Sequence, residues 1–212
     1  MEALAVHFEA TAEAEFAPRY NLAPTTRVPV VKATAAGRTL VLHHWGLIPS
    51  WAKDPALAGR LANARAETVA EKPSFRGPFR SRRCLVPADG FFEWQSLPGA
   101  AKQPFLFRAT QGGLLAIAGL WDRWEGPESA VLSCTLITTT ASGDLAGIHD
   151  RMPVLLAPAD FAAWLDPGNR DRDGLQALLR PAAEGLLCRV PVSPRVNKVS
   201  NDDPELLEPW DV

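Results

Sequence analysis

Prolines interrupt this chain along its whole length and limit the secondary structure that it can form. The 212 residues include 19 prolines against 15 glycines, and the prolines are spread throughout the sequence. Because proline lacks a backbone N–H and its ring clashes with the preceding helical turn, it leaves few uninterrupted runs for long helices. We therefore expect short strands and structured loops.

Short runs rich in β-branched, leucine or aromatic residues, bounded by Gly, Pro or Asp, are typical of strands. The predicted strands are 28–33, 38–47, 82–87, 104–109, 114–121, 131–139, 152–157 and 186–192. The run 104–109 alternates apolar and polar residues, which predicts a sheet with one face in water. The run 114–121 is apolar throughout, which predicts a fully buried strand.

Helices are expected in only three places, at 2–8, from Pro158 to Leu165, and at about 173–180, where Pro181 stops the last one. They are too few and too late in the chain for a doubly wound parallel sheet. No repeat or linker divides the sequence. We expect one α+β domain over 1–212, dominated by antiparallel strands, with an acidic tail from about 200 to 212.

The composition excludes several classes of protein. Hydrophobic residues make up 47% and charged residues 22%, as in soluble globular proteins, and the net charge of −2 excludes a histone-like wrapper of duplex DNA. Cys84, Cys134 and Cys188 lie far apart, which argues against a disulfide scaffold and fits a reducing compartment. The sequence has no signal peptide and no apolar run of membrane-spanning length. We expect a cytoplasmic protein with no membrane partner.

A metal site is not expected, because His43 and His44 are adjacent on a predicted strand and should point to opposite faces. The clearest charge feature is a basic segment between residues 60 and 83. Its basic residues, against Glu67 and Glu71, are Arg60, Arg65, Lys72, Arg76, Arg80, Arg82 and Arg83. Guanidinium groups bind phosphate bidentately, and tryptophans flank the segment, as in a groove for single-stranded nucleic acid. A plain solvated surface would explain the same charges.

Three residues are candidates for chemistry at this stage. His149 lies in a loop beside Asp150 and Arg151, which suits acid–base work, although a structural histidine hydrogen-bonded in a turn would explain the motif by itself. Glu93 is surrounded by aromatic residues, and an apolar setting raises a carboxyl pKa. It could also be an ordinary strand glutamate. Asn63, on a loop or strand edge, could orient a substrate or simply form a turn.

Several long motifs together resemble those of the SOS-response-associated peptidase (SRAP) family, in order and from about Leu4 to Val199. They are RYNLAPT (19–25), HWGLIPSWAKDP (44–55), NARAETVAEKPSFR (63–76), RRCLVPADGFFEW (82–94), IAGLWDRW (117–124) and IHDRMPVLL (148–156). The resemblance implies an α+β fold with a β-barrel-like core and a positively charged groove for single-stranded DNA. It implies action on abasic sites in DNA-damage and SOS responses. We expect a monomer without cofactor or metal.

The resemblance also implies a mechanism. In that family, removal of the initiator methionine, a peptidase reaction on the protein itself, exposes an N-terminal cysteine. Its amine and thiol then react with the abasic sugar aldehyde and close a thiazolidine ring, a covalent DNA–protein crosslink.

Site residues follow from the matching motifs. Asn63 is implied to position the reacting N-terminus, Glu93 to shuttle protons in crosslinking and peptide cleavage, and His149 to stabilise the ring-opened sugar and Schiff base. The implied DNA contacts are Arg65 and Arg151 on phosphates, with Trp51, Trp94 and the Asn21–Pro24 loop stacking against or wedging into the DNA.

The sequence departs from the family at its start. The family begins Met-Cys-Gly-Arg, whereas this chain begins Met1-Glu2-Ala3, and EALAVHF resembles the helix that normally follows that opening. The mid-chain cysteines have no α-amine with which to close the ring. We expect a gene start placed too late or a truncation, ahead of a true loss of the nucleophile. The alternative functions are a non-catalytic single-stranded-DNA binder and, ranked last, a general peptidase.

Overall fold

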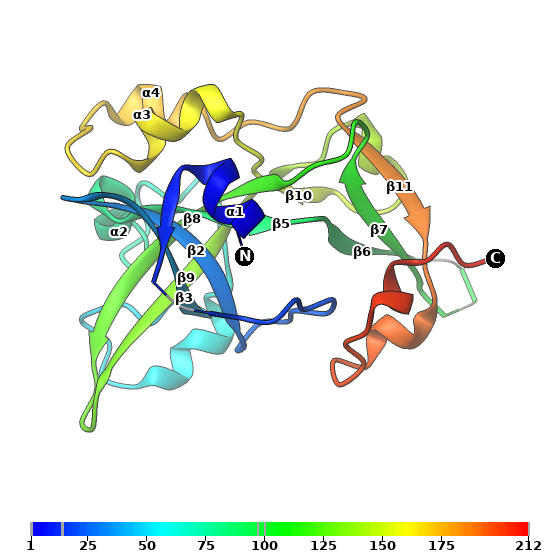
Figure 1. The fold of residues 1–212 in the computed structure, drawn as a ribbon, viewed down its shortest axis with the longest axis horizontal. Helices are drawn as coiled ribbons and strands as arrows, with labels where there is room; N and C mark the ends of the chain where they lie inside the picture. The colour runs from blue at the N-terminus through cyan, green and yellow to red at the C-terminus, as the bar shows by residue number, and fades with distance from the viewer. Residues whose placement is uncertain (1, 14, 97, 100, 212) are drawn as a thin grey trace.

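Five strands of the protein close into a barrel, seen in a computed structural model that describes residues 2–13, 15–96, 98–99 and 101–211 (Figure 1). The strands are β2 (Arg27–Thr34), β3 (Gly37–Trp45), β5 (Arg83–Ala88), β8 (Leu115–Glu125) and β9 (Ala130–Thr140). They pair in the order β3-β2-β5-β8-β9, and β9 pairs again with β3. That last pairing, parallel between His44–Trp45 and Ser133–Cys134, closes the ring.

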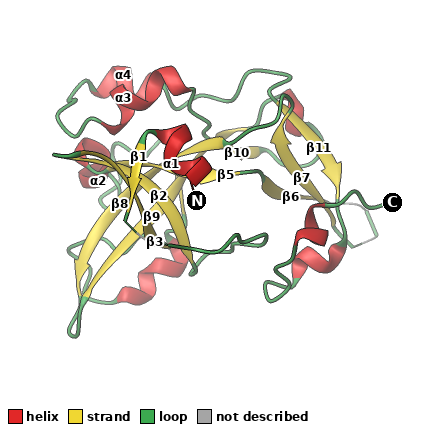
Figure 2. Cartoon of the chain, viewed as in Figure 1, coloured by secondary structure: helices red, strands yellow, loops and turns green. Residues whose placement is uncertain are grey.

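Three short strands extend this sheet, and β9 holds two of them. β4 (Asn63–Arg65) runs parallel to β9, and β10 (Arg151–Pro153) runs antiparallel to it. β1 (Ala10–Ala12) adds to β3. A second antiparallel sheet, in the order β11 (Leu187–Pro191), β7 (Gln103–Ala109) and β6 (Phe91–Gln95), lies beside the barrel (Figure 2).

Strand alternation divides the barrel side chains between two cores. Val30, Cys84 and Cys134 belong to the cluster inside the ring, so these two thiols are core residues as expected. Their strand neighbours Val31 and Leu85 belong to the outer core. The helices α1 (Glu2–Phe8), α2 (Arg76–Ser81), α3 (Phe161–Leu165) and α4 (Arg172–Ala177) supply residues to that outer core, so they cover the barrel from outside.

The predicted mixed α+β class, the early helix and most strands are confirmed. β10 is shorter than the predicted 152–157, because the chain after Pro153 enters the space where β8 and β9 part. There the Val154 amide donates to the Ile137 carbonyl of β9, and the Leu156 amide donates to the Ala116 carbonyl of β8. The last predicted helix is also shorter and ends at Ala177.

The prediction of one wet face for 104–109 is wrong. On β7, Leu106 packs against Val192 and Leu206, while Phe107 packs against Leu145 in a different cluster. Both faces of this strand are therefore covered, which the residue pattern alone did not reveal. Strands β1, β4 and β6 and helix α2 are not among the elements expected from the sequence. Among the residues that the structure describes, no helix is long and apolar enough to span a membrane.

Candidate functional site

Glu93 and His149, separated by more than fifty residues of sequence, line one cavity of about 440 Å³. Glu93 comes from β6, and His149 comes from the loop before β10. The lining residues are Glu93, Trp94, Lys102, His149 and Asn197. Two of the residues expected to carry the chemistry therefore meet in space, with Trp94 beside them.

Close backbone packing fixes the position of Glu93. β6 pairs with β7, and Glu93 lies opposite Phe105. Before β6, a Cβ atom at Gly90 would lie 2.5 Å from the Phe107 carbonyl oxygen, so only glycine allows the chain to enter the strand this closely. Gly90 thus allows the chain to enter β6 in close contact with β7.

The Glu93 carboxyl is set up to hold a proton. Its side chain is only 21% exposed, and its Oε2 lies 3.9 Å from His149 Nδ1, too far for a hydrogen bond but within range of charge interaction. Burial raises the pKa of Glu93, the nearby Asp150 charge raises it further, and His149 opposes both. Glu93 is therefore shifted towards the pH range in which it can both give and take a proton.

The His149 ring is held by the backbone of Arg151. Its Nδ1 lies 3.0 Å from the Arg151 amide nitrogen and 3.0 Å from the Arg151 carbonyl oxygen. Without a proton, Nδ1 accepts the amide hydrogen; with one, it donates to the carbonyl. Nδ1 of this imidazole, 42% exposed, thus has a backbone partner in either tautomer.

The Arg151 side chain is already engaged. Its guanidinium donates to both carboxylate oxygens of Glu67, at 2.7 and 3.0 Å, and to the Thr138 carbonyl at 2.6 Å. The hydrogen bond from Arg151 lowers the pKa of Glu67, and the charge of Arg65 contributes. Glu67 therefore remains ionised and occupies the face of Arg151 that was expected to bind phosphate.

Strand β4 presents Asn63 and Arg65 along the edge of β9. Both residues are exposed, and the intervening Ala64 is buried, as alternation on a strand requires. Arg65 lies opposite Thr138, the residue that Arg151 contacts. Arg65 is therefore close to Arg151, whereas Asn63 does not line the Glu93–His149 cavity.

The Asn21–Pro24 loop is anchored by its first residue. The buried Asn21 amide donates to the carbonyls of Val196 and Asn201, at 3.0 and 3.1 Å, and its backbone N–H donates to Asp202. Pro24 remains exposed at the far end of the loop. The acidic tail thus fixes this loop beside Asn197, which also accepts a hydrogen bond from the Trp94 indole.

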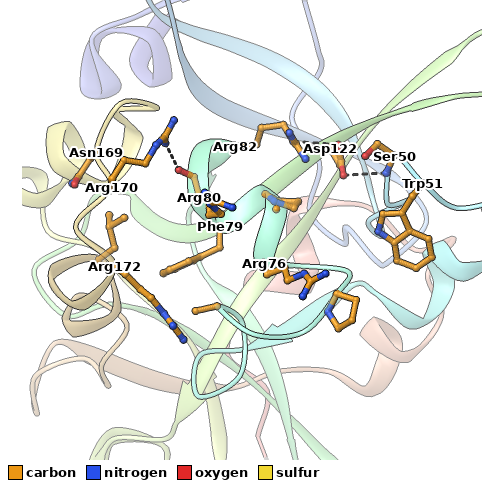
Figure 3. Close-up of a pocket in the computed structure, with 15 residues that line it drawn as sticks. Ser50, Trp51, Arg76, Phe79, Arg80, Arg82, Asp122, Asn169, Arg170 and Arg172 are labelled. Atoms are coloured by element: carbon orange, nitrogen blue, oxygen red, sulfur yellow. Dashed lines mark hydrogen bonds and ion pairs between the residues drawn. The ribbon is translucent and has the colours of Figure 1, made fainter.

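Trp51 does not join Trp94. It is 61% exposed and lines a separate cavity of about 930 Å³, which has no lining residue in common with the first (Figure 3). Three of the basic-segment residues, Arg76, Arg80 and Arg82, line this second cavity. Arg83 does not: it is buried and donates to the carbonyls of Trp164 and Phe79, so it supports the fold.

Several polar lining residues were not among the candidates from the sequence, four of them as follows. Lys102 and Asn197 line the first cavity, and Arg170 and Arg172 line the second. Each is a single polar or basic residue outside any recognisable pattern. Only the charge of the 170–172 stretch gave a signal, and nothing in the sequence joined it to residues 76–82.

No metal site is evident in the described part of the chain, where no three His, Cys, Asp or Glu side chains are grouped to hold an ion. His43 and His44 alternate on β3 as expected, with His43 fully buried. Burial and the charges of Lys32 and Arg27 lower the pKa of His43 to about 3, so this imidazole is neutral.

Comparison with known proteins identifies the family. The model of SOS response associated peptidase (SRAP) matches residues 1–199. The abasic site processing protein YoqW of Bacillus subtilis is 43% identical over 92% of this chain and 88% of its own length. The abasic site processing protein HMCES of Gallus gallus is 35% identical over 93% of this chain and 68% of its own length.

Two solved structures share the fold of this chain. A protein from Bacteroides thetaiotaomicron superposes with a TM-score of 0.80 and 28% identity, covering 88% of this chain and 82% of that one. A protein from Bordetella bronchiseptica gives a TM-score of 0.77 and 25% identity, covering 91% and 95%. On the family model over residues 1–199 and the similarity to YoqW, the chain belongs to the SOS response associated peptidase (SRAP) family.

Proposed function

We propose that this protein binds single-stranded DNA and processes abasic sites in the cavity between Glu93 and His149. Its relatives YoqW and HMCES are named abasic site processing proteins, and the chain is similar to both over most of its length. The observation that carries the proposal is the pairing of a half-buried carboxyl of raised pKa with a histidine 3.9 Å away. Such a pair moves protons near neutral pH.

The proposed reaction requires an N-terminal cysteine in this cavity. The α-amine attacks the aldehyde of the ring-opened abasic sugar, and the resulting carbinolamine loses water to give a Schiff base. The thiol then adds across the C=N bond, its proton passes to nitrogen, and a thiazolidine ring closes. Glu93 accepts and returns the protons of these steps, while His149 hydrogen-bonds the ring-opened sugar.

The same carboxyl would act in removal of the initiator methionine. In this step Glu93 takes a proton from water as the water oxygen attacks the Met carbonyl carbon. Glu93 then passes the proton to the nitrogen of the next residue, which leaves as the amine when the peptide bond breaks. Asn63 is proposed to position that amine. Because Asn63 lies on β4, outside the lining of the cavity, it would meet the N-terminus from the edge of β9.

The proposed DNA path follows the exposed groups around the cavity. Arg65 and Arg151 would contact phosphates, Trp94 would stack on a base, and Pro24 would wedge between bases. A phosphate reaching Arg151 must compete with the two hydrogen bonds from this guanidinium to Glu67. The need to displace Glu67 would therefore reduce the net free energy of DNA binding.

A crosslinking experiment tests the proposal. Single-stranded DNA with one abasic site is mixed with the 212-residue chain and with the same chain extended by Met-Cys-Gly-Arg and a connecting turn. We expect a heat-stable adduct only with the extended protein. The chain beginning at Met1 should give at most a reversible Schiff base, trapped by borohydride, because its α-amine has no adjacent thiol.

Two outcomes would contradict the proposal. A heat-stable adduct from the unextended chain would show that the N-terminal cysteine is not the nucleophile. DNA binding without an adduct from either protein would show that the chain is a non-catalytic single-stranded-DNA binder. Each result is read by denaturing electrophoresis of labelled DNA.

A further inference from the structure

The second cavity is lined by arginines that come from two distant parts of the sequence. Arg76, Arg80 and Arg82 lie on or directly after α2, and Arg170 and Arg172 lie at the start of α4 (Figure 3). The cavity, about 930 Å³ in volume, is large enough for several phosphate or sugar groups. The tertiary structure brings these five guanidinium groups together, and nothing in the local sequence indicates that they would meet.

The charges lining this cavity are unbalanced. Asp122 is the one acid among its described lining residues, and its side chain is only 4% exposed. Its carboxylate is held by Arg82 at 3.2 Å and accepts from the backbone N–H groups of Ser50 and Arg123. The carboxylate therefore neutralises one arginine and leaves an excess of positive charge facing the cavity.

Arg82 and Arg170 are held by partners within the protein, whereas the other three arginines are exposed. Arg170 donates to the Arg80 and Pro167 carbonyls, both at 2.6 Å, so it ties α2 to the start of α4. Among the described residues, no hydrogen bond or ion pair involves the guanidinium groups of Arg76 and Arg80. Arg172 has only a 3.4 Å contact with Glu71, and both side chains are more than half exposed. An exposed pair of this kind is weak, so an incoming phosphate can replace it.

The remaining lining suits a nucleotide strand rather than an isolated ion. Phe79 and Leu175, both nearly fully buried, provide an apolar wall. Trp51 is 61% exposed at the rim, where its ring is free to stack on a base. Arginines interleaved with an exposed aromatic side chain are the usual arrangement for binding single strands.

The segment 66–73 connects this cavity to the Arg151 side of the proposed reaction site. Glu67, near its start, pairs with Arg151, while Glu71 pairs with Arg172. Ala70 and Pro73 of the same segment line the second cavity. A DNA strand that leaves Arg151 would reach the arginines of α2 and α4 by crossing this single segment of the protein.

We propose that the second cavity binds consecutive phosphates of the DNA strand flanking the abasic nucleotide, with Trp51 stacking on one base. The inference rests on the proposed function, because it assigns the flanking part of the same DNA. It adds Arg80 and Arg172 as phosphate ligands and separates Trp51 from the reaction cavity. A free nucleotide or inorganic phosphate could occupy the same arginines through its phosphate group, and the experiment distinguishes these ligands from a DNA strand.

The test measures binding of undamaged single-stranded DNA, which isolates backbone contacts from abasic-site chemistry. Arg80→Gln and Arg172→Gln are compared with Arg123→Gln, which removes the same charge from an exposed arginine paired with Glu125. Fluorescence anisotropy is recorded over a range of salt concentrations. We expect each cavity variant to bind about fivefold more weakly. The slope of log K against log salt, which is negative, should become shallower by about 0.7. Trp51→Ala should weaken binding with no change of slope.

Three outcomes overturn the inference. If the cavity variants match Arg123→Gln in affinity and slope while wild type binds DNA, the inference fails and the proposed function stands. If they lose binding of inorganic phosphate or dAMP but not of DNA, the cavity is a small-anion site. If wild type itself binds no single-stranded DNA, the proposed function fails as well. Thermal unfolding of each variant identifies any that fails to fold, and the other cavity variant then decides the test.

Discussion

Glu67 holds the Arg151 guanidinium through a bidentate contact, with N···O distances of 2.7 and 3.0 Å. The pair lies between the His149 loop and β4, so the arginine expected to meet DNA phosphate already has an internal anion. This contact orients Arg151 before DNA arrives, and it also lowers the attraction of this surface for phosphate.

Removal of the Glu67 charge should strengthen DNA binding. In Glu67→Gln, Arg151 loses its competing carboxylate, so we expect severalfold tighter binding of single-stranded DNA. Glu125→Gln, which removes an exposed glutamate paired with Arg123, is the matched control. Anisotropy titrations at one salt concentration decide the point, and equal affinities for the two variants would contradict it.

Glu93→Gln should separate chemistry from binding. In the cysteine-bearing protein, loss of the proton shuttle should slow crosslinking by roughly 10²-fold, while DNA affinity stays unchanged. The crosslinking rate of the extended protein with Glu93 intact should also rise with pH through an inflection above the ordinary glutamate pKa, because burial raises the pKa of Glu93. Single-turnover rates at several pH values measure both effects. A near-wild-type rate in the variant would remove Glu93 from the mechanism.

Asn21 and Asn63 should give opposite results when each is replaced by alanine. The buried Asn21 amide satisfies carbonyls of the C-terminal segment, so Asn21→Ala should cost about 1–3 kcal/mol of unfolding free energy. Asn63 is exposed, so Asn63→Ala should leave stability within about 0.5 kcal/mol and slow crosslinking instead. Urea denaturation and crosslinking rates test the pair, and a stability loss in Asn63→Ala would refute this division.

His43 should make the protein less stable in mild acid. The pKa of His43 is lowered to about 3 in the folded protein, whereas it is about 6.5 in the unfolded chain. Between these two values the imidazole binds a proton in the unfolded chain and not in the folded protein. The stability is therefore intact above the unfolded pKa and falls as the pH drops, by about 2 kcal/mol at pH 5 from this group.

His43→Leu should remove this part of the pH dependence. Neither ring nitrogen of His43 has a hydrogen-bond partner among the described residues. Replacement by leucine therefore leaves no other group without its hydrogen-bond partner. Denaturation curves at pH 7 and pH 5 give the difference, and His7→Gln, at an exposed helix position, is the control. An unchanged pH dependence in His43→Leu would show that this imidazole does not titrate as described.

Local features of the sequence determined most strands of the barrel and several site residues. Dense prolines kept the helices short, and β-branched and apolar runs marked strands such as β8, which is buried from Leu115 to Leu120 as predicted. Phe91, Phe92 and Trp94 around Glu93 correctly indicated a half-buried carboxyl. These features are local: each depends on side chains a few residues apart, so the sequence alone could disclose them.

Only the tertiary structure decided which of these residues meet. β4 and β10 are three residues long and form because they hydrogen-bond with the backbone of β9. No local sequence pattern therefore predicts them. The same long-range packing joins Glu93 to His149, pairs Arg151 with Glu67, buries Arg83, and places Trp51 among the arginines of α2 and α4. A residue pattern reports whether a side chain prefers burial or water. Its partners are set by the order in which the strands close the barrel.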